Sequence, residues 1–348
     1  MIKNINFIDS INFTIKEIMK KDKNVVLFGL GVDDPKRIFN STRDLKEQFG
    51  STRVFDTPAS ENAMTGIGIG MSLNGLKPIM VHQRMDFFLL AMDQLINNAA
   101  KWKYMFGGHA KTPIVIRLIV GRGWGQGPTH SQNFQNLFAN IPGLKVYIPS
   151  FPSTARNLLI DATKGSDPVI IIEHRWLHYI NEKFDIKKIE KPIPIKKIKK
   201  GSDCTVVSMS YSTIEIIKIY ETLKKNGFSI DHFDVNIIRP LQVKNIFNSL
   251  KKTGKLLILD NSSHKFCSIG SEIISQLIQI EKNIFKKEPI LLTIPEIPSP
   301  SSFYLTKDYY HNEKSIVCAF EKLFGKRINC NFPTKLHDIP DPAFKGPF

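Results

Sequence analysis

Short apolar runs alternate with segments of helical period along the first half of the chain. The apolar runs have the length and composition of buried strands, and they cover residues 24–30, 77–82, 113–120, 144–150 and 168–174. Apolar residues recur at helical spacing between them, at Glu61–Leu73, Phe87–Lys101 and Pro152–Thr163. This alternation predicts a parallel sheet covered by helices, because each helix buries its apolar face against the strands.

The pattern changes near residue 180. Residues 181–201, NEKFDIKKIEKPIPIKKIKKG, are charged, contain prolines and lack helical period, which is typical of a connection between domains. A second series of alternating elements follows, with strands expected at 204–210, 229–236, 255–260 and 288–294, and helices at Ser212–Asn226, Gly270–Glu281 and Glu313–Phe324. We therefore expect an α/β protein of two domains, residues 1–182 and 201–348 with a linker at 183–200. Each domain should be a mainly parallel sheet flanked by helices, and a length of 348 residues fits two domains.

Composition places the chain among ordinary globular proteins. Hydrophobic residues make up 42% and charged residues 23% of the sequence. No apolar stretch approaches the roughly 20 residues that span a bilayer. The amino terminus mixes charges into an amphipathic pattern, without the apolar run and cleavage site of a signal peptide. We therefore expect a cytoplasmic protein with no function in a membrane.

The net charge of +16 raises the question of nucleic-acid binding. Much of the excess lies in residues 187–200 and in short lysine pairs, and no basic stripe with interleaved aromatic residues accompanies it. We therefore expect no nucleic-acid partner, while docking to an acidic protein stays open. The four cysteines are far apart and form no CxxC pair, which favours reduced thiols over a zinc site or a disulfide framework.

Three glycine patterns bear on ligand binding. Gly29 and Gly31 follow a predicted strand, but no third glycine completes the dinucleotide-binding pattern GxGxxG. Gly66, Gly68 and Gly70 lie within a predicted helix, where small residues permit close packing on a sheet. The glycine-dense loop Gly121–Gly127 follows a strand, and such loops bind ligands in α/β proteins. Only the last pattern suggests a functional loop.

Two further features are ambiguous by themselves. Ser60 can cap a helix and place Glu61 in its first turn, where a carboxylate complements the helix dipole, and this structural interpretation is locally the stronger one. His130 lies directly after the glycine-dense loop, next to Ser131 and Gln132. A histidine beside a serine makes no nucleophilic pair without an oriented base, and no further metal ligands lie nearby at suitable spacing.

Taken in order, these features resemble one family. The run RVFDTPASENAMTGIGIGMSLNGLKPIM (residues 53–80), the segment AMDQLINNAAKWKYMFGG (91–108) and PTHSQNFQNLFANIPGLKVYIPS (128–150) are similar to the pyrimidine-binding domain of thiamine-diphosphate-dependent 2-oxoacid dehydrogenase beta subunits. DVNIIRPL (234–241), KKTGKLLILDNSS (251–263) and residues 269–273 resemble the transketolase-type carboxy-terminal domain of the same subunits. The resemblance covers nearly the whole chain.

The resemblance implies a chemistry and a set of site residues. Thiamine diphosphate attacks the carbonyl of a 2-oxoacid, such as pyruvate, and accepts the electrons released on decarboxylation. By motif match Glu61 is the acid that hydrogen-bonds to the pyrimidine ring of the cofactor, and Phe87 is the aromatic residue beside that ring. His130 matches the active-site histidine, which orients the 2-oxoacid carboxylate or guides acyl transfer to lipoamide. Ser131 and Gln132 support the same loop.

The resemblance also implies partners. The family holds Mg²⁺ and the cofactor diphosphate through a Gly-Asp-Gly motif and a later Asn, and this sequence contains no Gly-Asp dipeptide. We therefore expect an alpha subunit to supply the metal and the diphosphate site in an α₂β₂ complex, with a lipoyl acyltransferase as a further partner. A structural potassium ion bound by main-chain carbonyls is also expected, at Ile114, Ala162, Gly165 and Asp167.

Several positions depart from the family pattern. Leu30 and Leu90 stand where acidic or polar residues are common, which puts communication between active sites in doubt. Arg122 and Trp124 give the glycine-dense loop an unusual character and suggest an altered substrate or acceptor. Three alternatives therefore stay open beside a lipoamide-acylating dehydrogenase: a biosynthetic enzyme of the same architecture with another acceptor, the carboxy-terminal half of a split transketolase, and a non-catalytic subunit that only binds partners.

Overall fold

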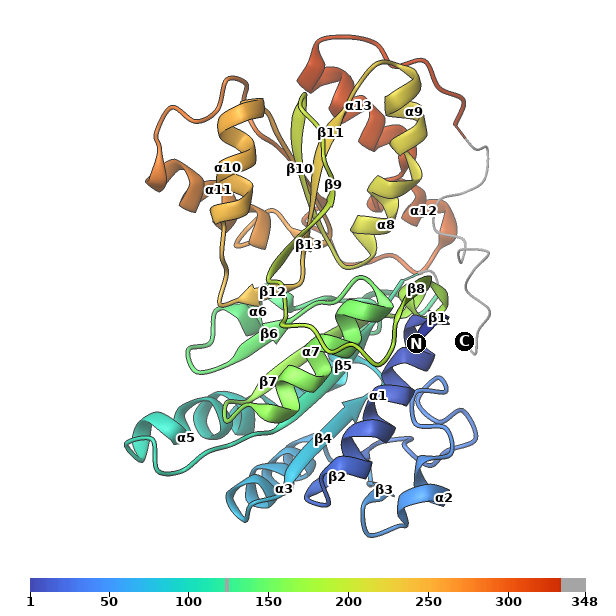
Figure 1. Ribbon diagram of the computed structural model, residues 1–348, viewed down its shortest axis with the longest axis vertical. Coiled ribbons are helices and arrows are strands. Elements are labelled where there is room, and N and C mark those ends of the chain that lie inside the picture. The colour runs from blue at the N-terminus through green and yellow to red at the C-terminus, as the bar shows by residue number, and fades with distance from the viewer. Residues whose placement is uncertain (123–124, 333–348) are drawn as a thin grey trace. The chain divides into compact units, whose positions relative to one another are not determined.

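The chain folds into two compact units in a computed structural model that describes residues 1–122 and 125–332 (Figure 1). Unit 1 contains residues 1–121 and 137–192, and unit 2 contains residues 122–136 together with the described residues from Ile193 onward. The boundary at Pro192 falls inside the connection expected at 183–200. The segment 122–136 belongs to unit 2 although the chain on both sides of it belongs to unit 1.

Unit 1 is a parallel sheet covered by helices, as expected. Within this unit the strands lie in the order β6-β7-β5-β4-β2-β3, and all neighbours pair in parallel. The strands of this sheet are β2 Val25–Gly29, β3 Val54–Asp56, β4 Lys77–His82, β5 Val115–Val120, β6 Lys145–Tyr147 and β7 Val169–His174. Every residue of β2, β5 and β7 is buried, which explains why their sequences are almost continuously apolar.

The helices of unit 1 confirm most of the expected pattern. Its regular helices are α1 Phe7–Lys21, α2 Leu45–Phe49, α3 Glu61–Leu73, α4 Met85–Phe88, α5 Ala100–Met105 and α7 Pro152–Lys164, while α6 Gln135–Ala139 begins in unit 2. Helices α1 and α7 pack side by side over one face of the sheet (Figure 1). The helix expected at Phe87–Lys101 is not continuous, because a 3-10 turn at Leu89–Ala91 and a π-helix at Gln94–Ala99 separate α4 from α5.

The sequence pattern missed a small ribbon at the amino terminus. Strand β1 (Ile2–Asn6) pairs with β8 (Asn181–Asp185) in antiparallel fashion. Both strands are short and largely exposed, so neither carries the apolar run that identifies a buried strand.

Unit 2 is a second, mainly parallel sheet with helices on both faces. Its strands lie in the order β14-β13-β10-β11-β9, and only the edge strand β9 pairs in antiparallel fashion. Its elements are β9 Ile195–Lys199, β10 Cys204–Met209, α8 Tyr211–Lys218, α9 Tyr220–Lys225, β11 Ile230–Val235, β12 Ile237–Arg239, α10 Lys244–Thr253, β13 Leu256–His264, α11 Ile269–Ile280, β14 Ile290–Ile294, α12 Phe303–Tyr309 and α13 Glu313–Phe324. The expected strands and helices are present, although the helix predicted at Ser212–Asn226 is interrupted at Ile219.

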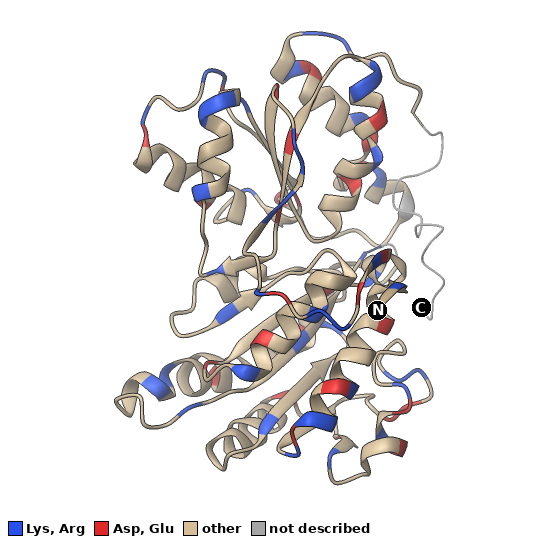
Figure 2. Ribbon diagram, viewed as in Figure 1, with Lys and Arg blue, Asp and Glu red and all other residues tan. Residues whose placement is uncertain are grey.

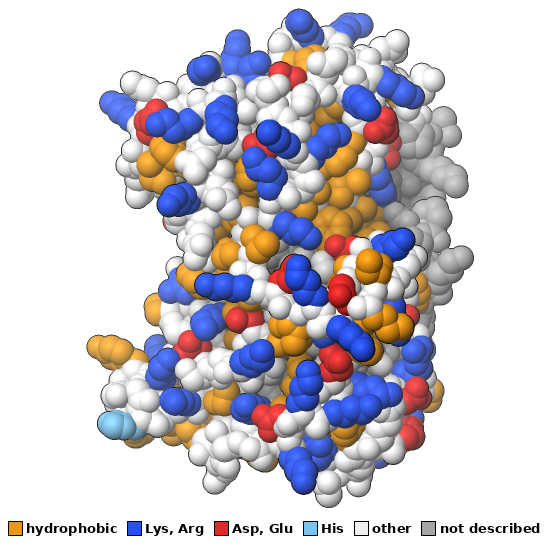
Figure 3. All heavy atoms as spheres, viewed as in Figure 1, with side chains coloured by type: hydrophobic (Ala, Val, Ile, Leu, Met, Phe, Trp, Pro, Cys, Tyr) orange, Lys and Arg blue, Asp and Glu red, His pale blue; other side chains and the backbone are white. Residues whose placement is uncertain are grey.

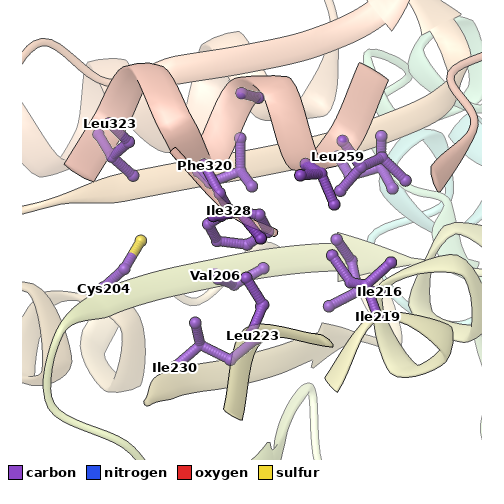
Figure 4. Packing of buried hydrophobic residues seen from close by; sticks show 14 residues of the cluster. Cys204, Val206, Ile216, Ile219, Leu223, Ile230, Leu259, Phe320, Leu323 and Ile328 are labelled. Carbon is purple, nitrogen blue, oxygen red and sulfur yellow. The ribbon is translucent and has the colours of Figure 1, made fainter. Parts of the chain in front are cut away.

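The core of unit 2 lies between its sheet and the helices α8, α9 and α13. Figure 4 shows Phe320 and Leu323 of α13 on one side of this cluster, with Cys204 and Val206 of β10 and Ile216 of α8 on the other. Burial of such side chains stabilises a fold by about 1.5–3 kcal/mol each. This core fixes α8, the helix that carries the buried side chain of Glu215.

The charges of the chain are spread over its surface. Figure 2 shows lysine and arginine residues on helices and loops of both units, with acidic residues among them. In the space-filling view of Figure 3, basic side chains are interspersed with polar and apolar ones, and no continuous basic stripe crosses this face. None of the helices in the described ranges has the length and apolarity to cross a membrane.

Candidate active site and the segment that carries His130

The carboxyl ends of the parallel strands in unit 1 meet at one edge of the sheet, which we term the carboxyl edge. Gly29 at the end of β2 lies opposite Asp56 of β3 and Val81 of β4, so these three strands end at the same level. Asp56 Oδ1 accepts hydrogen bonds from the backbone N–H groups of Gly31 (2.7 Å) and Thr57 (3.0 Å). These bonds fix the loops that leave the sheet at the point where α/β proteins bind ligands.

Glu61 is the first residue of α3, five residues after β3 ends at Asp56. Ser60 takes the N-cap position, as expected, but its hydroxyl makes no capping hydrogen bond. The side chain of Glu61 is only 9% exposed. Within residues 1–122 and 125–332, its carboxylate has no hydrogen-bond or ion-pair partner.

The side chain as a whole is mostly buried, yet neither carboxylate oxygen is among the fully buried side-chain atoms that lack a hydrogen-bond partner in the described residues, so the carboxylate is accessible from outside the unit. An accessible carboxylate that the chain itself does not bind, at the edge where α/β sheets bind ligands, is available to a ligand that hydrogen-bonds to it. The ring nitrogen of an aminopyrimidine is a suitable partner for a carboxyl group. The residues present thus fit the pyrimidine end of a cofactor, and they also show why the helix-dipole interpretation of Glu61 is incomplete.

Close packing holds α3 against the sheet. A Cβ atom on Gly68 would lie 2.7 Å from Ile114 Cδ1 and 3.1 Å from Phe28 Cζ, which leaves no room for a larger residue. Gly66 has more space, and nothing lies near Gly70. The expected role of these glycines in close helix–sheet packing is therefore confirmed at Gly68, and this contact sets the height at which Glu61 stands over the carboxyl edge.

Phe87 lies in α4, and its side chain is 39% exposed, whereas the neighbouring Phe88 is fully buried against His82 and Phe138. The 3-10 turn that continues α4 packs against α3. Glu61 and Phe87 therefore come from packed elements of the same unit. An aromatic ring that remains accessible there is available to a flat ligand.

A buried cluster of arginines lies at the same carboxyl edge and was missed in the sequence. The guanidinium groups of Arg84 and Arg175 lie 5.6 Å and 4.3 Å from the centroid of the Phe39 ring. Burial lowers the pKa of each to about 10, and for Arg84 the charge of Arg175 adds to this effect. Arg117 of β5 donates to both carboxylate oxygens of Glu173, at 2.6 Å and 2.8 Å. The sequence signal for this cluster was Arg117, an arginine inside the otherwise apolar run VIRLIV at residues 115–120.

His130 lies in a segment of unit 2, and we term residues 125–136 the His130 segment. Its imidazole is half-buried, with Thr129 Oγ1 2.9 Å from Nδ1, and its backbone N–H donates to the carbonyl of Gly127 at 3.3 Å. Ser131 and Gln132 are half-buried beside it. Trp124, which the sequence placed in the same loop, lies outside the described residues.

Arg122 precedes the His130 segment and is buried, with 4% exposure. Its guanidinium donates to Glu215 Oε1 at 2.5 Å and lies 4.2 Å from the centroid of the Tyr310 ring. Asn261 Nδ2 donates to the other carboxylate oxygen of Glu215 at 2.7 Å. The cation expected to distinguish the substrate loop therefore has a buried partner within unit 2, and it is not displayed on the surface.

Gln135 holds the other end of the His130 segment. Its side-chain amide donates to Asp260 Oδ1 at 3.1 Å and to Ser263 Oγ at 3.0 Å, and all three side chains are buried. Burial raises the pKa of Asp260 to about 6, although hydrogen bonds from Ser263, Ser262 and Gln135 oppose the shift. Neither Asp260 nor Glu215 stood out as a site residue in the sequence.

The residues expected to bind potassium lie in unit 1, around the carboxyl end of α7. The Ile114 carbonyl accepts a hydrogen bond from Val169 N–H at 2.9 Å, and the Ala162 carbonyl faces Gly165. The Asp167 carboxylate binds Lys103 Nζ at 2.6 Å and Lys145 Nζ at 3.1 Å. Nothing in this arrangement requires an ion, so the potassium site stays a prediction. In the described ranges, no group of three or more His, Cys, Asp or Glu side chains could hold a metal.

The structure thus divides the predicted site residues between the units. Glu61, Phe87 and the potassium residues belong to unit 1, and Arg122 and His130–Gln132 belong to unit 2. Leu30 is half-buried and Leu90 is 67% exposed. Both side chains are apolar, so neither position carries the acidic or polar group that is common there in the family.

Comparison with known proteins divides the chain between residues 179 and 194, and it includes Arg122 and His130 in the first matched region although both belong to unit 2 of the structure. Residues 3–179 match the family described as transketolase, pyrimidine binding domain, and residues 194–316 match transketolase, C-terminal domain. A solved chain described as a split gene transketolase, inactive beta4 tetramer, has a similar fold, with a TM-score of 0.74, 17% identity and coverage of 93% of this chain and 100% of that one.

Three relatives extend over most of the sequence. The chain is 32% identical to the acetoin:2,6-dichlorophenolindophenol oxidoreductase subunit beta of Bacillus subtilis, over 94% of this chain and 99% of the relative. It is 34% identical to the 2-oxoisovalerate dehydrogenase subunit beta of the same organism, over 92% and 98%. It is also 34% identical to the pyruvate dehydrogenase E1 component subunit beta of Porphyra purpurea, over 84% and 88%. With this similarity and both transketolase-type domains in order, the chain belongs to the beta-subunit family of the thiamine-diphosphate-dependent 2-oxoacid dehydrogenases.

Proposed function

We propose that this chain is the catalytic beta subunit of an enzyme that oxidatively decarboxylates a pyruvate-like 2-oxoacid and transfers the acyl group to lipoamide. The observation that carries the proposal is the Glu61 carboxylate, which lies on a mostly buried side chain at the carboxyl edge and has no partner in the described residues. Thiamine diphosphate, the cofactor of the family to which the chain belongs, would offer its aminopyrimidine as the ligand of that carboxylate.

Each residue of unit 1 has a specific task in this proposal. Glu61 would hold the pyrimidine ring nitrogen of the cofactor by a hydrogen bond from its carboxyl group, and a proton shared there would favour base chemistry at the exocyclic amine. Phe87 presents its exposed ring to the pyrimidine, and Gly68 keeps α3 at the height that this contact needs. When bound, the cofactor supplies the carbon nucleophile and accepts the electrons released on decarboxylation.

His130 acts on the substrate side. Its ring is half-buried and is oriented by Thr129, and it can donate a hydrogen bond to the 2-oxoacid carboxylate or to the acyl acceptor. Ser131 and Gln132 support the backbone around it. Neither task requires His130 to form a covalent bond.

The proposed enzyme needs an alpha subunit. The sequence contains no Gly-Asp dipeptide, so we assign Mg²⁺ and the diphosphate site to a second polypeptide in an α₂β₂ complex. The relatives support this assignment, since each is named as a beta subunit. A lipoyl acyltransferase is the proposed further partner, and it would receive the acyl group.

The test is to produce the chain alone and together with an alpha subunit that carries Gly-Asp-Gly. With the alpha subunit, release of CO₂ from pyruvate or a branched 2-oxoacid should reach a turnover of at least about 1 per second. The chain alone should release none. Decarboxylation by the chain alone would contradict the assignment of half an active site to it.

The acyl acceptor is tested in the same preparation. Reduction of lipoamide at a rate close to that with an artificial electron acceptor supports the dehydrogenase proposal. Decarboxylation with the artificial acceptor but without lipoamide reduction would favour the biosynthetic alternative. Arg122 no longer favours that alternative, because its charge is paired with Glu215 inside unit 2.

A further inference from the structure

The sheet of unit 2 has a point where its strand order reverses. From β10 the chain continues to β11 on one side, and it then returns to β13 on the other side of β10. In open α/β sheets, ligands bind beyond the carboxyl ends of the two strands that flank such a point. Here those strands are β10 and β13, and we term the position beyond their ends the switch point.

Three polar residues mark the switch point. Asp260 and Asn261 lie in β13 directly after its pairing with β10 ends at Leu259, and Glu215 lies on α8, the helix that follows β10. All three are at least 96% buried. Asn261 joins the two elements, because its amide donates to Glu215 Oε2 and its backbone N–H donates to Ser212 Oγ at 3.1 Å.

The partners of both buried carboxylates come from the chain itself. Arg122 binds Glu215, and Gln135 binds Asp260, so the residues on either side of His130 are each joined to the switch point. Gly127, which lies between Arg122 and Gln135 in the sequence, makes a third contact with Ser301, because a Cβ atom on Gly127 would clash with Ser301 Oγ. Gly127 in turn accepts the backbone hydrogen bond of His130.

We infer that the switch point of unit 2 is a built-in receptor for the chain's own His130 segment, with Arg122–Glu215 and Gln135–Asp260 as paired anchors that position His130. Unit 2 thereby serves the reaction although it contributes none of the residues proposed to contact the pyrimidine. Arg122, Glu215, Gln135 and Asp260 are positioning residues, because each acts through the segment and none contacts substrate. The catalytic part of this inference depends on the proposed function, while the anchoring part does not.

The anchoring is tested by hydrogen exchange in the full-length chain. Glu215→Gln keeps the shape of the side chain but removes the charge that holds Arg122, so the amides of residues 125–136 should exchange about tenfold faster or more. Glu173→Gln is the matched control, because it breaks the same kind of buried arginine–glutamate pair in unit 1. It should leave the segment at the wild-type rate. A segment that exchanges at the wild-type rate in the Glu215→Gln chain would overturn the anchor.

A second variant covers the case in which Glu215→Gln does not fold. Gly127→Ala changes the segment and leaves the core of unit 2 untouched, and its methyl group should push the segment away from Ser301. Faster exchange at residues 125–136 supports the receptor. Unchanged exchange argues against it.

The positioning role is tested by kinetics in the complex with the alpha subunit. Glu215→Gln should lower kcat by about tenfold when His130 is present and by less than about twofold in a His130→Ala background, since the anchor acts through His130. Equal losses of kcat in both backgrounds would show a general structural effect and would contradict the positioning role. If the wild-type complex were inactive, the proposed function would fail, and the exchange result would still decide the anchor.

Discussion

The two sheets of this chain differ in whether the acidic residues at their carboxyl edges have partners within the chain. In unit 1, the carboxylate of Glu61, whose side chain is mostly buried, has no hydrogen-bond or ion-pair partner among the described residues. In unit 2, Glu215 and Asp260 are more deeply buried, and Arg122 and Gln135 bind them. Both edges are the places where α/β architectures bind ligands.

The difference shows how one architecture can serve two purposes. An acid that lacks a partner at such an edge is available to a ligand from outside the chain, and this is the role proposed for Glu61. Acids that the chain itself satisfies hold a loop in place instead. The distinction depends on the partners and not on the residue type, so identical substitutions at the two edges should have different consequences.

The largest expected contrast is in stability. Glu215→Gln removes the carboxylate charge that binds the buried Arg122 and should lower the free energy of unfolding of unit 2 by about 3 kcal/mol. Glu61→Gln removes a carboxylate that has no such partner. It should change the stability of unit 1 by less than about 1 kcal/mol, because only the helix-dipole interaction is lost.

Hydrogen exchange of the slowest amides in β5 and β10 measures the two stabilities separately. Glu313→Gln is a useful control for Glu61→Gln, since Glu313 is also the first residue of a helix, α13. Equal destabilisation by Glu61→Gln and Glu215→Gln would break the comparison, because Glu61 would then have a structural partner.

A smaller effect is expected from the titration of Asp260. Its pKa in the folded chain is about 6, above the ordinary value of 3.8, so folding favours the protonated acid. The associated stability is complete below pH 4 and is lost as the pH rises through 6. Asn at this position does not titrate. Between pH 4 and pH 7 the stability of Asp260→Asn should therefore improve relative to wild type by about 2 kcal/mol.

Chemical unfolding of both chains across this pH range measures the difference. A stability difference that stays constant from pH 4 to pH 7 would mean that Asp260 is not the buried acid described here. Gln135, Ser262 and Ser263 do not titrate in this range, so the pH dependence of the difference comes from Asp260 itself.

The sequence predicted the architecture well where burial imposes a strong pattern. The expected strand at 77–82 and the helices Glu61–Leu73 and Glu313–Phe324 coincide with β4, α3 and α13. Strands β1 and β9 were missed, because they are short and carry many polar residues. For such strands, pairing with a distant partner decides the structure, and a single sequence does not show the partner.

The site was predictable only in part, for the same reason. Glu61 and His130 were found because the motifs around them resemble a known family. The partners of Arg122 and Gln135 lie 93 and 125 residues further along the chain, and no local pattern links them. Arg122 therefore stood out in the sequence as an unusual loop cation, whereas its buried contact with Glu215 emerged only from the fold.

The central claim is that Glu61 activates the cofactor through its pyrimidine ring. The most direct test is the rate at which the thiazolium C2 proton of bound thiamine diphosphate exchanges with solvent in the complex with the alpha subunit. Glu61→Gln should bind the cofactor and slow this exchange by at least about 100-fold, the contribution expected of positioned acid–base catalysis, while Glu313→Gln should exchange at the wild-type rate. Exchange at the wild-type rate in the Glu61→Gln complex would contradict the account.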